Sequence, residues 1–213
     1  MAMVTARLSA DDPQAIAAAL QVLQAGGLVV FPTDTVYGVA CDLWNESAIA
    51  RLYEAKARPR SLAVPVLVAS PTDVSQVARD LTPAFYSGVE RFWPGALTLV
   101  VLRRPEVPAI LCAGQDSVAV RMPAHPLALE LLRRAGGALA VTSANRSGDA
   151  SSATADDAYD DLHGKAELLI DGGRCPGGMA SAIVDLTVEP PRLLRRGLLT
   201  PRELAAVWPG LQA

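Results

Sequence analysis

Residues 28–38 read LVVFPTDTVYG, an apolar run that becomes polar after its proline. The run at 28–31 predicts a short buried strand, which Pro32 ends. The turn that follows carries two threonine hydroxyls and a tyrosine phenol at a strand end, where α/β proteins usually bind ligands. A plain polar turn that leaves through Gly38 has the same composition, so this stretch alone predicts a strand and a turn without deciding a site.

Strands and helices alternate irregularly on both sides of this stretch. Several predicted strands follow one another without a helix between them, which favours an α/β sheet of mixed direction over a regular doubly wound sheet. Pro65 falls inside one predicted strand and indicates an edge strand or a bulge. The predicted strands are 28–31, 63–69, 97–102, 117–122, 138–142, 167–171, 181–186 and 192–195; the predicted helices start at Asp11-Asp12-Pro13, cover 47–56, 71–80, 83–92, 126–135 and 154–162, and restart at Thr200-Pro201.

The composition is that of an ordinary globular protein. Of its 213 residues, 51% are apolar and 19% are charged, which allows a sizeable core and argues against a disordered chain. The longest apolar runs are far too short to cross a bilayer, and the first residues lack the apolar segment of a secretion signal. We therefore expect a cytoplasmic protein without a membrane anchor.

Cysteine and histidine are scarce. Cys41, Cys112 and Cys175 are scattered without a CxxC motif and indicate reduced thiols in a cytosol. The only histidines are His125 and His163, so a zinc site is nearly excluded and no protein metal site is expected. The net charge of −3 argues against a general nucleic-acid binder, so any RNA contact must depend on a local basic patch.

Lys56 and Arg58 belong to the basic motif KARP. Arg58 precedes a proline and is biased toward extended geometry, in which residues two apart point the same way. The two cations would then form a clamp of the kind that phosphoryl transfer needs. Taken alone, the motif fits a solvated helix terminus better. However, Lys56 is one of only two lysines among 19 basic residues, which suggests a point charge that a planar guanidinium would not replace.

The segment SVAVRMP, at 117–123, alternates as a strand. Val118 and Val120 would face one side of the sheet, and Ala119 and Arg121 the other. A cation at the end of an apolar strand is costly unless it is paired, so Arg121 needs an anion. That anion is either a protein carboxylate or a substrate carboxylate bound by two hydrogen bonds, and the sequence leaves both open.

Other polar groups also follow or begin apolar strands. The loop TSANRSG, at 142–148, has hydroxyls and an amide that suit phosphate or ribose, although an ordinary turn has the same composition. Ser181 begins one strand and Arg195 ends another. The sequence has no GxxxxGK[ST], no GxGxxG after a strand and no Ser–His–Asp or Cys–His set. The residues thus indicate an α/β enzyme with a basic, hydroxyl-rich site for a nucleotide and a small acid.

Six motifs occur together and in order: PTDTVYG, KxRP, VAVRMPxHP, TSANxSG, SAIVD and RRG. This combination, over residues 13–205, resembles the YrdC/TsaC family of threonylcarbamoyl-AMP synthases. The resemblance implies a single YrdC-like domain over 1–213, with a twisted mixed β-sheet, flanking helices and an open basic cavity. It also implies that L-threonine and bicarbonate give N-carboxythreonine, which attacks the α-phosphate of ATP and expels pyrophosphate, with Mg²⁺ held mainly by the ATP phosphates.

The resemblance also assigns roles to individual residues. Lys56 and Arg58 are expected to be catalytic by positioning the triphosphate and stabilising charge, since no covalent nucleophile or general base is evident. The product would pass to a downstream tRNA threonylcarbamoyl-transfer complex. Threonine would contact Thr35, Arg121 and Ser181, and ATP would contact Lys56, Arg58, Ser143, Asn145, Ser151 and Arg195.

One stretch departs from the family pattern. Leu62 and Leu67 stand where relatives often have side chains that touch ligands, so contacts there are expected to differ. Two other functions stay open: an RNA-binding module without catalysis, built on arginines such as Arg192 and Arg196, and a carbamoyl-transfer maturation domain. The net charge of −3 and the lack of aromatic residues among the basic ones oppose tight RNA binding. The absence of zinc-finger and acylphosphatase regions opposes the maturation domain.

Overall fold

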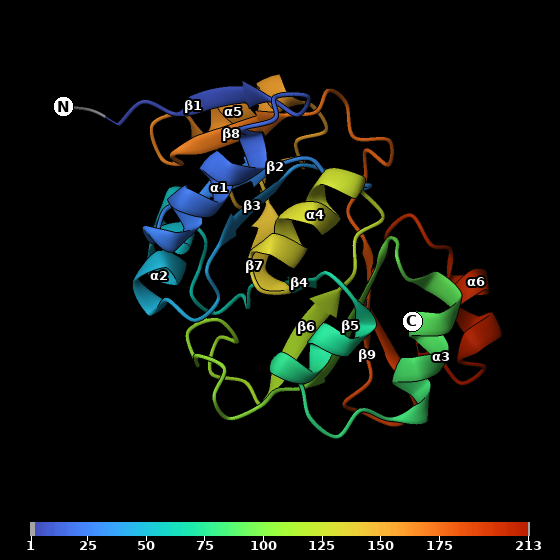
Figure 1. Cartoon of the computed structure of the whole chain (residues 1–213). Coiled ribbons are helices and arrows are strands. Elements are labelled where there is room, and N and C mark those ends of the chain that lie inside the picture. The colour runs from blue at the N-terminus through green and yellow to red at the C-terminus, as the bar shows by residue number, and fades with distance from the viewer. Residues whose placement is uncertain (1–2, 213) are drawn as a thin grey trace.

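Ten strands form one sheet in the computed structural model, which describes residues 3–212 (Figure 1). They are β1 (Ala6–Ser9), β2 (Val29–Phe31), β3 (Gly38–Cys41), β4 (Val66–Val68), β5 (Leu97–Leu102), β6 (Ser117–Arg121), β7 (Ala138–Ser143), β8 (Leu168–Asp171), β9 (Ala182–Asp185) and β10 (Arg192–Arg195). Their order is β1-β8-β2-β3-β7-β4-β6-β5-β9-β10. Parallel pairs such as β4–β6 and β5–β9 occur beside antiparallel pairs such as β3–β7 and β5–β6. The predicted α/β sheet of mixed direction is confirmed.

The helices flank this sheet. They are α1 (Ala15–Gln24), α2 (Glu46–Ala55), α3 (Pro83–Phe92), α4 (Pro126–Arg134), α5 (Ala155–Leu162) and α6 (Pro201–Val207), with a 3-10 helix at Pro71–Gln76. The start predicted at Thr200 is confirmed by a capping box, in which Thr200 and Glu203 each accept a backbone N–H from the other. Within residues 3–212, no helix is long and apolar enough to cross a membrane.

Helices α1 and α4 lie side by side across one face of the sheet (Figure 1). Leu23 of α1 and Leu131 of α4 belong to one buried cluster with Phe31, Leu67 and Val141 of the strands. The opposite face carries a larger cluster, to which α2, α3, α5 and α6 contribute. The sheet therefore separates two hydrophobic layers.

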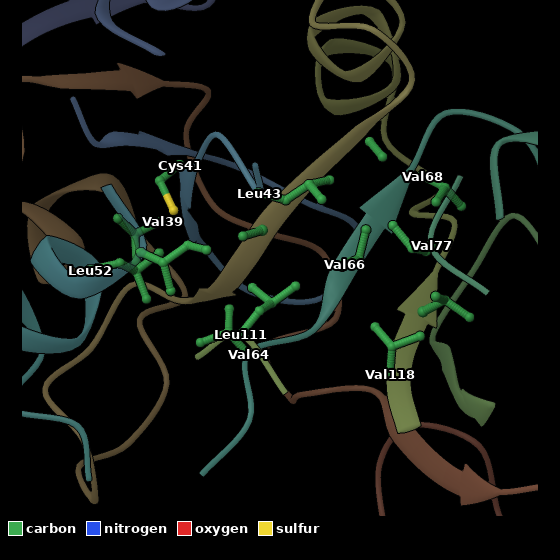
Figure 2. Packing of buried hydrophobic residues seen from close by; sticks show 14 of the residues in the cluster. Val39, Cys41, Leu43, Leu52, Val64, Val66, Val68, Val77, Leu111 and Val118 are labelled. Carbon is green, nitrogen blue, oxygen red and sulfur yellow. The ribbon is translucent and has the colours of Figure 1, made fainter. Parts of the chain in front are cut away.

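Figure 2 shows part of the larger cluster. Val39 and Cys41 of β3 lie beside Leu52 of α2, while Val66 and Val68 extend the same layer along β4. Alternate residues of each strand contribute to this layer, and their neighbours point to the α1–α4 face. The short apolar strands of this sequence are thus buried on both faces.

The α1–α4 face continues onto β6, β5 and β9, where it lines a cavity. In register, Leu67 of β4 lies opposite Arg121 of β6. Ala119 of β6 lies opposite Val100 of β5, which lies opposite Asp185 of β9. Residues in register point to the same face, so the two helices and the cavity occupy one side of the sheet.

The expectation of an edge strand or bulge at Pro65 is wrong. Strand β4 lies in the interior of the sheet, between β7 and β6. It begins at Val66, so the N–H that proline lacks falls outside the ladder. The carbonyl of Pro65 still accepts a hydrogen bond from the Val141 N–H, at 2.8 Å.

The predicted start of α1 at 11–13 is also wrong. Asp12 accepts a hydrogen bond from the Gln14 N–H, at 2.8 Å, and holds a turn instead of capping the helix, which begins at Ala15. The helix predicted at 71–80 is the short 3-10 helix. Strands β1 and β3 are not predicted, because four residues without strict alternation give too little periodicity.

Candidate active site

A cavity of about 520 Å³ lies against β4, β6, β5 and β9. Arg58, Arg121, Arg192 and Arg195 line it, and Asp185 is the only acidic residue among its lining residues. The remaining wall combines hydroxyl and aliphatic side chains. Its volume is in the usual range of a small-molecule site, roughly 300–1,000 Å³. Its charge indicates a site for anions.

Arg121 is held from three sides at the end of β6. Its Nη2 donates to Asp34 Oδ1 at 2.6 Å, its Nη1 to Thr35 Oγ1 at 2.9 Å, and its Nε to the carbonyl of Gly95 at 2.9 Å. The side chains of the ion pair are only 7% and 13% exposed. Burial lowers the pKa of Arg121, and Asp34 opposes that shift. Of the two anions that the sequence leaves open, the structure contains the protein carboxylate.

The predicted alternation along β6 is confirmed. Val118 and Val120 are buried in the larger hydrophobic cluster, and Ala119 and Arg121 line the cavity. Because strand residues alternate between faces, the guanidinium reaches the cavity without a bend in the strand.

The hydroxyl protons of the turn after β2 can be assigned. Thr33 Oγ1 donates to the carbonyl of Val36 at 2.6 Å and lies 3.0 Å from Thr35 Oγ1. A hydroxyl has one hydrogen, so Thr35 must donate in the second contact. Thr35 Oγ1 also accepts from Arg121, which leaves one lone pair. Thr35 belongs to the cavity lining, although it is fully buried behind the surface of the wall.

Ser181 and Arg195 form a second polar group on the cavity wall. Ser181 Oγ lies 2.7 Å from Thr98 Oγ1 and accepts from Arg195 Nη2 at 3.2 Å. Arg195 also donates to the carbonyl of Ser181, from Nε at 3.1 Å and Nη2 at 2.9 Å. Gly197 allows this approach, because a Cβ there would lie 2.4 Å from the carbonyl carbon of Ser181.

Arg58 and Arg195 lack the compensation that Arg121 has. Arg58 donates only to the carbonyls of Leu62, at 3.1 Å, and Ala63, at 2.7 Å. Among residues 3–212, no carboxylate forms an ion pair with Arg58 or Arg195. Burial lowers the pKa of Arg195, and the charges of Arg121 and Arg58 lower it further. Two uncompensated cations therefore line the same cavity.

The geometry expected for Lys56 and Arg58 is wrong. Lys56 is the helical C-cap of α2, and Ala57 is left-handed with φ of 48°, so the segment is not extended. The cavity lining includes Arg58 but not Lys56. Lys56 is only 1% exposed, which also excludes the solvated helix terminus.

Lys56 instead ties the loop after β7 to the end of α2. Its ammonium donates to the backbone carbonyls of Ser143 and Asn145, and its own carbonyl accepts from the Ser147 N–H at 2.9 Å. Burial lowers the pKa of Lys56 to about 8, with the charge of Arg58 as a second cause. A compact ammonium can reach two carbonyls in this space, which explains why a lysine stands here in a chain whose other cations are mostly arginines.

The end of β7 and the loop that follows it carry three of the expected nucleotide contacts. Ser143 lines the cavity, whereas Asn145 and Ser151 lie outside its lining. The amide oxygen of Asn145 is buried and has no hydrogen-bond partner among the described residues. The carbonyl of Ser152 accepts from the Tyr37 N–H at 2.9 Å, so the loop is anchored to the turn after β2.

The cavity thus brings most of the expected residues together. It also involves two residues, Asp34 and Thr98, that the sequence did not assign to the site. Asp34 lies inside a recognised motif, but nothing local shows that it pairs with Arg121. Thr98 is the one hydroxyl of the apolar strand LTLVVL, which is the signal that could have identified it. The expected residues that line the cavity are Thr35, Arg58, Arg121, Ser143, Ser181 and Arg195.

Carboxylates are poorly placed to hold a metal. Within residues 3–212, no three side chains of His, Cys, Asp or Glu are grouped as metal ligands. Asp185 accepts from the backbone and hydroxyl of Thr187, at 2.9 and 2.6 Å, and from Arg192 at 3.4 Å. A metal ion in this cavity would therefore be bound mainly by oxygen atoms of a bound small molecule.

Comparison with known proteins shows the family of this chain. The profile of the Sua5–YciO–YrdC family, described as telomere recombination, matches residues 21–197. A threonylcarbamoyl-AMP synthase of Pyrococcus abyssi is 40% identical over 185 residues, covering 87% of this chain and 54% of that protein. A putative threonylcarbamoyl-AMP synthase of Mycobacterium tuberculosis is 38% identical over 208 residues, covering 96% of this chain and 95% of that protein.

Solved structures give the same result. The crystal structure of P. abyssi Sua5 complexed with L-threonine has a TM-score of 0.92 and 37% identity, and the match covers 100% of this chain and 62% of that one. The chain therefore spans little more than half the length of the archaeal relative and nearly the whole length of the mycobacterial one.

Proposed function

This chain belongs to the Sua5–YciO–YrdC family, and on this basis we propose that it synthesises threonylcarbamoyl-AMP. The substrates are L-threonine, bicarbonate and ATP. Threonine and bicarbonate form N-carboxythreonine with loss of water, and a carbamate oxygen of this compound attacks the α-phosphorus of ATP. The bond from the α-phosphorus to the bridging oxygen breaks, and pyrophosphate leaves. The product serves the formation of threonylcarbamoyladenosine in tRNA.

One observation of the cavity carries this proposal. A compensated cation, Arg121, lines the same cavity as two uncompensated cations, Arg58 and Arg195. An amino acid or its carbamate presents one carboxylate to the first, whereas a triphosphate brings several negative charges to the others. The charge distribution of the wall thus matches an amino acid beside a nucleotide.

We place threonine at Arg121, Thr35 and Ser181. The guanidinium offers two-pronged hydrogen bonds to the threonine carboxylate. Thr35 Oγ1 has one lone pair left that could accept from an N–H of the amino acid. Ser181 lines the same cavity, and its hydroxyl accepts a hydrogen bond from Arg195.

We place ATP along Arg58, Arg195 and the loop after β7. Arg58 and Arg195 offset the charge of the phosphates, and stabilisation of charge developing on the leaving pyrophosphate lowers the barrier. Ser143, Asn145 and Ser151 surround the nucleotide. Lys56 acts on this half of the site by fixing the carbonyls of Ser143 and Asn145, so its catalytic part is positioning.

Mg²⁺ fits this cavity as a companion of ATP. The donor set is rich in hydroxyls and guanidiniums, and the oxygens of Asp185 already accept three hydrogen bonds. We propose that the phosphates hold the ion, which offsets their charge. No side chain among the described residues is assigned as its direct ligand.

The remaining proposals concern the surroundings of the domain. Residues 1–213 would act as one YrdC-like domain in the cytosol, where its three free cysteines stay reduced. The product would be taken up by a tRNA threonylcarbamoyl-transfer complex. Any RNA binding would be weak and sensitive to salt, because it would depend on a few arginines. The names of the relatives favour the synthase over an RNA-binding module or a carbamoyl-transfer maturation domain.

An omission assay tests the proposal. Purified protein is incubated with ATP, Mg²⁺, bicarbonate and threonine, and pyrophosphate is measured over time. Release should require threonine and bicarbonate together and should be weak with most other amino acids. Equal release without an added amino acid would indicate a plain ATPase and would reject the proposed function.

A further inference from the structure

Asp34 lies behind Arg121 and outside the cavity lining. Its Oδ1 accepts from Arg121 Nη2 at 2.6 Å and from the Ala124 N–H at 3.0 Å. One carboxylate oxygen thus joins the turn after β2, the end of β6 and the segment that leads into α4. This position suits a residue that acts on the substrate only through Arg121.

The contact with Asp34 determines which N–H groups of Arg121 remain free for a ligand. A guanidinium has five N–H donors. Three of them are used within the protein, by Asp34, Thr35 and the carbonyl of Gly95. The two that remain belong to different terminal nitrogens, an arrangement that allows two-pronged binding of a carboxylate. Loss of the Asp34 contact would free Nη2 and allow the planar group to turn about its long side chain.

The charge of Asp34 has a second consequence. Arg121 is nearly buried, and a buried guanidinium without a counterion is costly. Asp34 supplies that counterion before any substrate arrives, so the cation is kept inside the cavity wall instead of turning toward water. Arg58 and Arg195 have no such partner among the described residues. The pair of Arg192 with Asp185 is longer, at 3.4 Å, and its arginine is 52% exposed, so Arg121 is the buried paired arginine of this wall.

We propose that Asp34 is a positioning residue that holds Arg121 with two N–H groups directed at the carboxylate of the amino-acid substrate. This inference rests on the proposed function for the identity of that substrate. It assigns a functional role to a residue that touches neither substrate nor reacting atoms.

The test compares two variants of Asp34. Asp34→Asn keeps an acceptor oxygen of the same reach, and Asp34→Ala removes it. In the pyrophosphate assay, Asp34→Ala should raise the KM for threonine about tenfold while the KM for ATP changes by less than about threefold, as expected for one weakened charged hydrogen bond. Asp34→Asn should raise the threonine KM less than Asp34→Ala does, because it keeps the hydrogen bond and loses only the charge.

Controls separate positioning from general stability. Asp156→Ala removes a carboxylate from an exposed ion pair with Arg7, outside the cavity lining, and should leave both KM values unchanged. If Asp34→Ala does not fold, Asp34→Ser replaces it, because a serine hydroxyl is polar but too short to reach Nη2. An unchanged threonine KM in the folded variant, with a lower melting temperature alone, would overturn the inference.

A spectroscopic readout keeps this result apart from a failure of the proposed function. In nitrogen-15 NMR of arginine side chains, the terminal N–H groups of Arg121, assigned by their loss in Arg121→Lys, should rotate slowly in the wild type and in Asp34→Asn. They should rotate faster in Asp34→Ala or Asp34→Ser. Absence of threonine-dependent pyrophosphate release by the wild type would reject the proposed function, whereas unchanged rotation in the variants would reject the role of Asp34 whatever the activity.

Discussion

The arginines of the cavity differ in what neutralises them. Arg121 has a carboxylate at 2.6 Å and is almost buried with it. Arg58 and Arg195 donate to backbone carbonyls and a hydroxyl, and no carboxylate of residues 3–212 pairs with them. We call the part of the cavity around Arg121 the first wall and the part around Arg58 and Arg195 the second wall. The arginine of the first wall therefore serves both the fold and the site, whereas the arginines of the second wall serve mainly the site.

This difference predicts how each wall responds to mutation. Removing one partner of a buried ion pair leaves the other charge unpaired, so the first wall should lose stability as well as binding. Removing an uncompensated cation leaves no orphaned charge, so the second wall should lose activity alone. The predictions below use that contrast, from the largest expected effect to the smallest.

Arg58→Ala should abolish most activity without unfolding the protein. The substitution removes a cation that stabilises the phosphates, and loss of one such group costs about 100-fold or more in rate. The free energy of unfolding should change by less than about 1 kcal/mol, because only two backbone carbonyls lose a donor. Pyrophosphate release and denaturant unfolding measure the two effects. Arg60→Ala, an exposed arginine outside the cavity lining, is the matched control, and equal activity in both variants would contradict the charge assignment.

Lys56→Arg should cost activity and stability together. The planar guanidinium cannot occupy the position of the ammonium, so the loop at Ser143 and Asn145 should shift, and a misplacement of about one ångström can cost on the order of 100-fold in rate. The melting temperature should fall, because Lys56 is only 1% exposed. Lys165→Arg, at the other lysine of the chain, is exposed and should be silent. Full turnover in Lys56→Arg would show that charge alone suffices.

Arg121→Ala should raise the KM for threonine roughly 10- to 100-fold, with little change in the KM for ATP. It should also lower the free energy of unfolding by about 3 kcal/mol, since Asp34 is left as a buried, unpaired carboxylate. Adding Asp34→Ala to this variant should recover part of the stability and none of the threonine affinity. A stable Arg121→Ala with a normal threonine KM would remove the distinction between the two walls.

The smallest expected effect is the titration of Lys56. Burial lowers its pKa from 10.5 to about 8, so between these values the unfolded chain binds more protons than the folded one. The contribution of Lys56 to the free energy of unfolding should therefore be constant below pH 8 and rise as the pH increases toward 10.5. Activity should change in the opposite direction, falling to about half its plateau near pH 8 as half of the ammonium is lost.

Lys56→Met separates this titration from that of other groups. The variant has no ammonium, so the difference between its pH profiles and those of the wild type isolates Lys56. Identical pH dependence of activity and unfolding in the two proteins would show that Lys56 does not titrate in this range.

Much of the fold follows from local sequence patterns. The apolar strands at Leu97–Leu102 and Ser117–Arg121 and the helix at Pro83–Phe92 are predicted within a residue. Strand β3 is missed because four apolar residues directly after a turn carry no periodicity. The central place of β4 is missed because Pro65 indicates an edge, and only the sheet order shows that the proline lies just before the ladder.

The site was predictable where a single strand or motif decides it. Alternation along β6 places Arg121 on the cavity side, and the cost of an unpaired cation predicts that it needs an anion. The identity of that anion is not local, since Asp34 is 87 residues away along the chain. The position of Lys56 was also not predictable, because the backbone of Ala57 is left-handed, an uncommon conformation for alanine, and breaks the extended geometry expected between Lys56 and Arg58.

Isotope transfer tests the central claim most directly. The protein is incubated with ATP, Mg²⁺, threonine and carbon-13 bicarbonate, and the nucleotide products are analysed by mass spectrometry. The account predicts a product that contains AMP, threonine and one carbon-13 atom, formed in step with pyrophosphate. Pyrophosphate release with AMP or a threonyl adenylate that lacks the labelled carbon would contradict it.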